Sequence, residues 1–195
     1  MSLEAAHTKF ETAMTDPANL VAIHKKVKTG AGKRVQELAL NRAIVVLTVA
    51  AWQAYVQDIT REAMDLLKPA GPPMQQWNLT NAQVTRAIQL FSTPNAENTR
   101  DLLIFVGFDP RPFWTWKVGQ ENLSSASACE RMNRWLQVRH AIAHGHDALP
   151  DVPMLAKLKD GSRALGRANA EACMTFFERV VAKTDAAIRA QFVVP

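Results

Sequence analysis

The sequence predicts an all-α fold, a helical bundle built around one long central helix. The stretch 33–68 contains no proline or glycine, and its apolar residues fall on one helical face by recurring every three or four positions. They are Leu40, Ile44, Leu47, Ala51 and Ala54. No alternating pattern elsewhere competes for a strand, and long helices joined by short turns are typical of bundles. We therefore expect a single domain over residues 1–195.

The order of the other helices follows from their start and stop signals. Before the central helix, Asp16 can cap and Pro17 can begin a short helix over 17–28, followed by a basic glycine loop. The prolines of 69–73 end the central helix because each lacks an N–H and clashes with the preceding turn. Further helices are expected over 80–91, capped by Thr80 and Asn81, and over 95–107, 121–143 and 164–192, with irregular segments at 108–119 and 150–161.

Composition places the chain among ordinary folded proteins. It has 195 residues, of which 48% are hydrophobic and 21% charged, and a chain of this length buries about 70% of its unfolded surface. Its two cysteines, Cys129 and Cys173, lack the spacing of a paired site and are expected to be buried thiols. Residues 1–13 do not resemble a signal peptide, and the longest apolar run, 43–52, is short of the roughly 20 residues that cross a bilayer. We expect a cytoplasmic protein without a membrane segment.

A formal net charge of +5 favours anionic partners, nucleic acid among them. The loop before the central helix is not a phosphate loop of a nucleotide hydrolase, because Val27 replaces its first glycine and Arg34 its serine or threonine. Lys33 and Arg34 of this loop can instead contact an RNA backbone, and the loop can equally be a plain solvated connection. Arg134 is a further candidate for RNA binding.

The segment 111–117 alternates basic and aromatic residues. Such a segment can be a platform on which nucleic-acid bases stack. More often it anchors a loop on the core, and we expect that role here.

Three of the five histidines lie beside Arg139, where a long helix is closed by Gly145. Arginine carries a permanent charge on a fork of donors that fits phosphate, and histidine exchanges a proton near neutral pH. Together they suit phosphodiester cleavage, with a histidine acting on the ribose 2′-hydroxyl or the leaving oxygen. On a continuous helix Arg139 and His144 lie about 140° apart, whereas His140 and His144 lie about 40° apart. Fraying at Gly145 would turn His144 toward the side of Arg139.

Two other roles for this segment stay open. Cations near a helix C-terminus complement the helix dipole, so Arg139 and His144 can be structural. His140, His144 and His146, followed by Asp147, could hold a metal because a spacing of four residues places two imidazoles on one face. The segment lacks the glutamate that follows the first histidine in metalloproteases, and we expect neither a metal nor a cofactor.

The run from Arg139 through Ala141-Ile142-Ala143 to His144 resembles the Arg-x4-to-6-His signature of the HEPN superfamily of helical ribonucleases and toxins. The stretch 38–58 also resembles the first core helix of its RiboL-PSP-HEPN branch, so the likeness covers about 33–145. The resemblance implies a HEPN-like helical bundle that forms a homodimer, with two Arg/His pairs facing each other in a cleft between protomers. It also implies metal-independent RNA cleavage that leaves a 2′,3′-cyclic phosphate.

Arg139 and His144 carry over directly from that signature, and His140 stands where relatives have a polar residue, often Asn. Gln53 departs from the pattern, because relatives commonly have a glutamate after the tryptophan of that helix, and Asp58 could replace it. Some members of the superfamily only bind RNA or a protein partner of the antitoxin type. The resemblance therefore implies either an endoribonuclease or a silent binding module, in phage defence, toxin–antitoxin control or RNA processing.

Overall fold

The computed structural model describes residues 3–26, 35–71, 74–119 and 121–192. Its helices are α1 (Ala5–Ala13), α2 (Thr15–Lys26), α3 (Val35–Leu66), α4 (Gln75–Leu90), α5 (Ala96–Ile104), α6 (Ser125–Ala143) and α7 (Arg167–Phe192), with a short 3-10 turn η1 at Arg111–Phe113. Two hairpins complete the described chain: β1 (Trp116–Val118) with β2 (Glu121–Leu123), and β3 (Ala156–Lys157) with β4 (Arg163–Ala164). The all-α prediction and the long central helix are confirmed.

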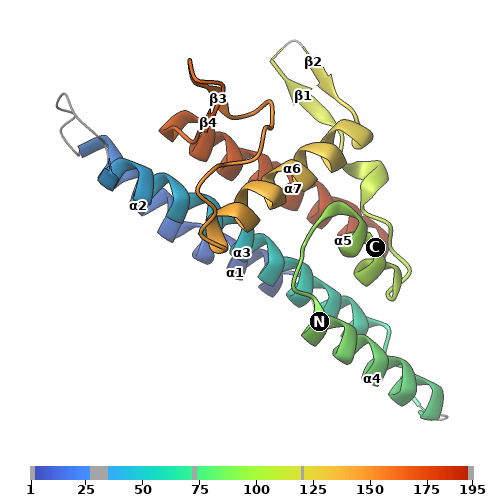
Figure 1. Cartoon of the computed structure of the whole chain (residues 1–195). Helices are drawn as coiled ribbons and strands as arrows, with labels where there is room; N and C mark the ends of the chain where they lie inside the picture. Colours follow the sequence, from blue (N-terminus) through green and yellow to red (C-terminus); the bar gives the residue numbers. More distant parts are fainter. Residues whose placement is uncertain (1–2, 27–34, 72–73, 120, 193–195) are drawn as a thin grey trace.

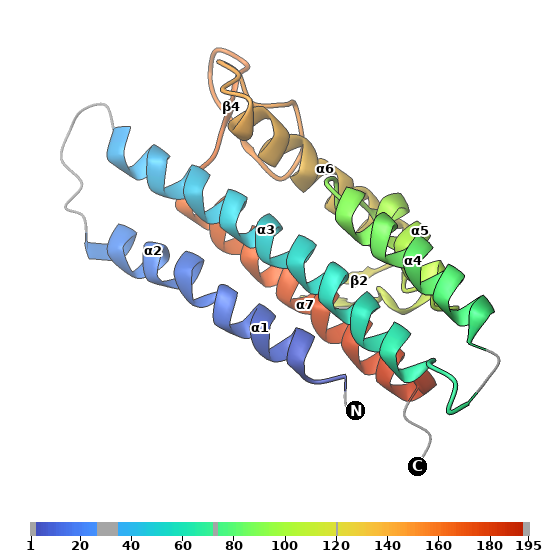
Figure 2. The same cartoon turned by 90° about the horizontal axis from the view of Figure 1, so that it is seen from below.

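Helix α3 is the axis of the bundle (Figures 1 and 2). Helix α7 runs along one side of it, α1 and α2 follow each other along a second side, and α4, α5 and α6 lie across a third. By length and composition α3 could cross a membrane, but half of its most apolar window is buried by these neighbours. We therefore assign it as the core helix of the bundle.

Trp52 of α3 lies at the centre of the core and is fully buried. Its ring stacks on Tyr55 at 5.8 Å between centroids and meets Phe177 of α7 at 5.9 Å and Trp114 at 6.3 Å. The indole Nε1–H donates a 2.9 Å hydrogen bond to the carbonyl of Pro94. One side chain thus joins α3, α7 and both segments that flank α5.

Several boundaries differ from those expected. Helix α4 begins at Gln75, so Thr80 and Asn81 lie inside it and do not cap it, because Trp77 in its first turn packs against the core. Helix α5 is confirmed but spans Ala96–Ile104, with Asn95 as its cap accepting a 2.7 Å hydrogen bond from the Asn98 N–H. Helix α6 begins four residues later than expected, with Ser124 as its cap.

The expectation of no strands is wrong for two short hairpins. Trp116 pairs with Leu123, and Lys157 pairs with Arg163, in antiparallel register. Strands of two or three residues are too short to give an alternating pattern, so the tertiary contacts select them. The second hairpin also explains why α7 begins at Arg167 and not at Ala164.

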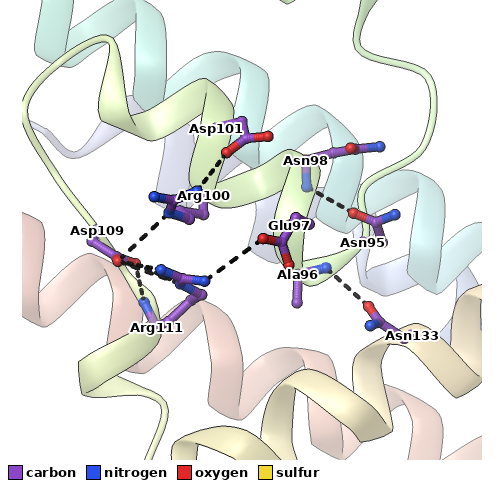
Figure 3. Close-up of polar contacts among 9 residues, drawn as sticks. All are labelled: Asn95, Ala96, Glu97, Asn98, Arg100, Asp101, Asp109, Arg111 and Asn133. Carbon is purple, nitrogen blue, oxygen red and sulfur yellow. Dashed lines mark hydrogen bonds and ion pairs between the residues drawn. The ribbon is translucent and has the colours of Figure 1, made fainter.

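A polar cluster fastens the segment after α5 (Figure 3). Arg111 donates to the Asp109 carboxylate at 2.8 Å, and Arg100 and Glu97 of α5 contact the same pair at 3.9 Å. The hydrogen bonds from Arg111 hold the pKa of Asp109 below its usual value. Each cation of this cluster therefore has an acidic partner.

The cysteines are both free. Cys173 is fully buried as expected, whereas Cys129 is only partly buried. Burial raises the pKa of both thiols, so neither has the thiolate character of a reactive cysteine.

We predict that Trp52→Ala lowers the free energy of unfolding by about 3–5 kcal/mol, because it removes a buried aromatic and leaves a cavity. Leu90→Ala on α4 is the control, since Leu90 is 70% exposed and its truncation should cost at most about 0.5 kcal/mol. Urea unfolding followed by circular dichroism measures both. Equal losses in the two variants would contradict the central role of Trp52.

Candidate functional site

Helix α6 does not fray at its end. The Gly145 N–H donates to the Ile142 carbonyl at 3.2 Å, and the His146 N–H donates to the Ala141 carbonyl at 2.9 Å. These two bonds close the helix in a Schellman motif, which requires a left-handed residue that Gly145 supplies at φ 65°. The turn fixes the direction in which the chain leaves the helix.

The turn gathers three exposed imidazoles. The ring centroids of His140 and His144 lie 4.1 Å apart, and His146 lies 5.9 Å from His140 and 6.3 Å from His144. His140 and His144 meet because four residues separate them on the helix, and His146 returns to them through the Schellman turn. We call these residues the histidine cluster.

The cluster lowers the pKa of His140 below its usual value of 6.5. The neighbouring groups partly remove the ring from water, and His144, His146 and Arg139 add positive charge nearby. Both effects disfavour the charged imidazolium. The lowered pKa of His140 favours the neutral imidazole, which is the form that can accept a proton.

On the continuous helix α6, Arg139 lies about 140° around the axis from His144. Its side chain is half-buried, and its Nε is enclosed without a hydrogen-bond partner among the described residues. His144 stays on the side of His140, so the expected turn of His144 toward Arg139 by fraying is wrong. The structure brings the histidines together, and no hydrogen bond or ring contact joins Arg139 to His144 within the described chain.

A pocket of about 550 Å³ adjoins the cluster, between the segment 93–95 that precedes α5, helix α6 and the segment 146–150. His140 and His146 line it, whereas Arg139 and His144 do not. Its other polar lining includes Asn95, Asn133 and Gln137, and its apolar lining Leu136, Leu149 and Pro150. Polar groups over an apolar wall are typical of a ligand pocket.

Sequence reasoning did not find Asn133 and Gln137. They precede His140 by seven and three residues, which places all three on one side of the helix. That spacing was a usable signal. Asn133 accepts a 3.1 Å hydrogen bond from the Ala96 N–H through its side-chain oxygen, so α5 fixes its orientation.

Neither Gln53 nor Asp58 reaches the histidine cluster through a contact in the described chain. The Gln53 amide donates a 2.8 Å hydrogen bond to the Phe91 carbonyl and holds α3 to the end of α4. Asp58 forms ion pairs with Lys9 at 3.2 Å and with Arg61. Asp58 therefore does not replace the glutamate of relatives as an orienting group.

The RNA-binding candidates differ in their placement. Lys33 and Arg34 lie outside the described residues. Arg134 is half-buried on α6 and forms an ion pair with Glu130 four residues earlier. Its charge is therefore partly neutralised before any RNA approaches.

A metal site is not found in the part of the chain that the structure describes. No group of three or more His, Cys, Asp or Glu side chains there is arranged to hold an ion. The three imidazoles are close, but closeness of rings alone does not direct three lone pairs at one point.

We predict that an NMR titration of the imidazole signals gives His140 a pKa below 6.5, and that His144→Asn raises it by removing a positive neighbour. Lys159→Ala, which removes an exposed cation of the β3–β4 turn, is the control and should leave it unchanged. A His140 pKa that His144→Asn does not raise would contradict the coupling.

We predict that Gln53→Glu costs about 1–3 kcal/mol of stability at pH 7, because a carboxylate cannot donate to the Phe91 carbonyl. A protonated glutamate can donate, so its folded pKa should rise above the unfolded value of about 4.3. The loss should be complete above the folded pKa and should vanish as the pH falls below about 4.3. Urea unfolding at pH 7 and pH 4, referred to the parent protein at each pH, tests this; an equal loss at both would contradict it.

Comparison with known proteins gives one match. The family model RiboL-PSP-HEPN matches residues 18–190, which is most of the chain. No curated protein and no solved structure matches. The matched region contains α3, the histidine cluster and α7, and the all-α architecture around α3 agrees with it. The chain belongs to the RiboL-PSP-HEPN family.

Proposed function

We propose that the protein is a metal-independent endoribonuclease whose site includes Arg139, His140 and His144. Family membership suggests a nuclease or another RNA-related role. The observation that carries the finer proposal is the exposed histidine cluster at the end of α6, two of whose members, His140 and His144, lie within the Arg-x4-His segment. Its members lie 4.1 to 6.3 Å apart, and the pKa of His140 is lowered, so a neutral base and a second proton carrier lie side by side.

The reaction needs one base and one acid. A neutral imidazole removes the proton of a ribose 2′-hydroxyl, and that oxygen forms a bond to the adjacent phosphorus. The bond from phosphorus to the 5′-oxygen breaks, and an imidazolium gives its proton to the leaving oxygen. The products are a 2′,3′-cyclic phosphate and a 5′-hydroxyl. In this proposal Arg139 binds the phosphoryl oxygens, where a guanidinium fork fits best.

The separation of Arg139 from His144 within one chain supports a site shared between two copies. A two-fold dimer that faces α6 against α6 would present the arginine of one protomer to the histidines of the other. The histidine cluster is exposed and leaves room for such a partner. One phosphodiester would then contact both protomers.

The central test is incubation of purified protein with structured and unstructured RNA in excess EDTA. We expect cleavage with cyclic phosphate ends, and a rate lowered by about 10²–10⁴ in His144→Ala, which removes a proton carrier. Arg139→Ala should be impaired comparably. Arg86→Ala, an exposed cation of α4, is the control and should cleave like the parent. No cleavage by the parent across varied RNAs would remove the nuclease proposal.

The shared site makes a separate prediction. Mixing Arg139→Ala with His144→Ala in equal amounts, after exchange of subunits, should restore activity to about a quarter of the parent level, because about half of the dimers are then mixed and each mixed dimer has one site with both side chains intact. Size-exclusion chromatography with light scattering should report a dimer. No recovery of activity in a confirmed and exchanging dimer of the two variants would show that each protomer works alone.

A second candidate function is RNA binding or protein binding without cleavage. Gln53 favours it, because the amide is held by the Phe91 carbonyl and no carboxylate stands at that position of α3. Binding of RNA or of an antitoxin-type partner that survives Arg139→Ala and His144→Ala, with no cleavage by the parent, would support this candidate. Phage defence, toxin–antitoxin control and a cytoplasmic location fit both candidates.

A further inference from the structure

A second hollow, of about 340 Å³, lies between the β1–β2 hairpin, α6 and α7. The hairpin stands beside the two helices in Figure 1. Trp116 of β1 is half-buried there and lies against the buried Phe176 of α7, with 5.8 Å between ring centroids and 48° between planes. Phe176 therefore supports an indole that is still open to a ligand on the hollow's side.

Three cations from three separate elements line this hollow. They are Lys117 of β1, Arg131 of α6 and Arg179 of α7. None of them forms a hydrogen bond or ion pair within the described chain, and the described lining contains no acidic side chain. Arg100 and Arg111 in Figure 3 differ, because Asp109 and Glu97 neutralise them.

Three cations without acidic partners lie in the same hollow as the Trp116 ring, which packs on Phe176. This combination indicates the class of ligand that the hollow binds. Converging like charges repel each other, and an anion relieves that repulsion. Phosphates of a nucleic acid supply the anion, and an unpaired base supplies a flat face for the indole. A duplex hides its base faces, and an acidic peptide has no base, so neither uses both features.

We propose that the hollow binds single-stranded RNA, with one base stacked on Trp116 and phosphates at Arg131, Arg179 and Lys117. The inference takes RNA as ligand from the proposed function, but it does not require cleavage. Arg131 precedes His144 by thirteen residues on α6, about 20 Å along the helix axis. A strand of several nucleotides can therefore contact both sites, and the hollow would hold the RNA beyond the cleavage site.

The sequence segment 111–117 now divides into two roles. Trp114 is fully buried and donates a 2.8 Å hydrogen bond to Thr184, and Arg111 is paired with Asp109, so this part anchors the core as expected. Its last two residues, Trp116 and Lys117, line the hollow. The stacking platform is thus confined to the start of the hairpin.

The test measures binding of a fluorescent 12-nucleotide uridine RNA by anisotropy, over a series of salt concentrations, in the His144→Ala protein so that the probe stays intact. Arg131→Gln/Arg179→Gln should raise the Kd about tenfold and should reduce the slope of log K against log salt by about 1.4, or about 0.7 for each lost phosphate contact. The matched control is Lys68→Gln/Arg86→Gln, which removes one exposed cation just after α3 and one on α4 and has the same net charge as the first double variant. It should bind like its parent.

Trp116→Leu tests stacking separately. It keeps an apolar contact with Phe176, and it should raise the Kd about tenfold without changing the salt slope. A thermal unfolding curve close to that of the parent shows that the fold is intact. If Trp116→Leu unfolds, the proposal is tested by comparing the two double variants, which have equal net charge.

The outcomes separate this inference from the nuclease proposal. Weaker binding by Arg131→Gln/Arg179→Gln than by its charge-matched control supports the hollow, whether or not the parent protein cleaves RNA. Equal Kd values and equal salt slopes in the two double variants would overturn the proposal that the hollow binds RNA, even if the parent protein cleaves RNA. That result would also be the one expected if an acidic protein were the true ligand of the hollow.

Discussion

Trp52 joins parts of the chain that are far apart in sequence. Its ring contacts Trp114 and Phe177, and its N–H holds the Pro94 carbonyl between α4 and α5. A buried indole combines a large apolar surface with one directional hydrogen bond. It therefore fixes both the distance and the orientation of the segments packed around it. The placement of α6 depends on this contact, because α5 meets α6 through the Ala96 N–H and Asn133.

The closing turn of α6 sets the positions of the three histidines at the end of that helix. A left-handed glycine lets the chain reverse within two residues, which brings His146 back to His140 and His144. Partial removal from water and the neighbouring His144, His146 and Arg139 lower the pKa of His140 below its usual value. The same turn holds His144 beside His140 and does not turn it toward the side of Arg139.

Charge is distributed unevenly over the surface. Around η1 each arginine has an acidic partner, whereas the hollow beside β1 has three cations and no acid in its described lining (Figure 3). Both arrangements come from a chain with a net charge of only +5. Local pairing, and not net charge, therefore decides where an anion can bind.

The sequence by itself determined the all-α class, the central helix and the Arg139–His144 segment, because helical periodicity and short motifs are local properties. It missed the hairpins, since strands as short as those that pair Trp116 with Leu123 leave no alternating pattern in the sequence. Tertiary structure alone decided that Gln53 holds Phe91, that Asp58 pairs elsewhere, and that Lys117, Arg131 and Arg179 share one hollow. Contacts between residues distant in sequence depend on how whole elements pack, which no local pattern encodes.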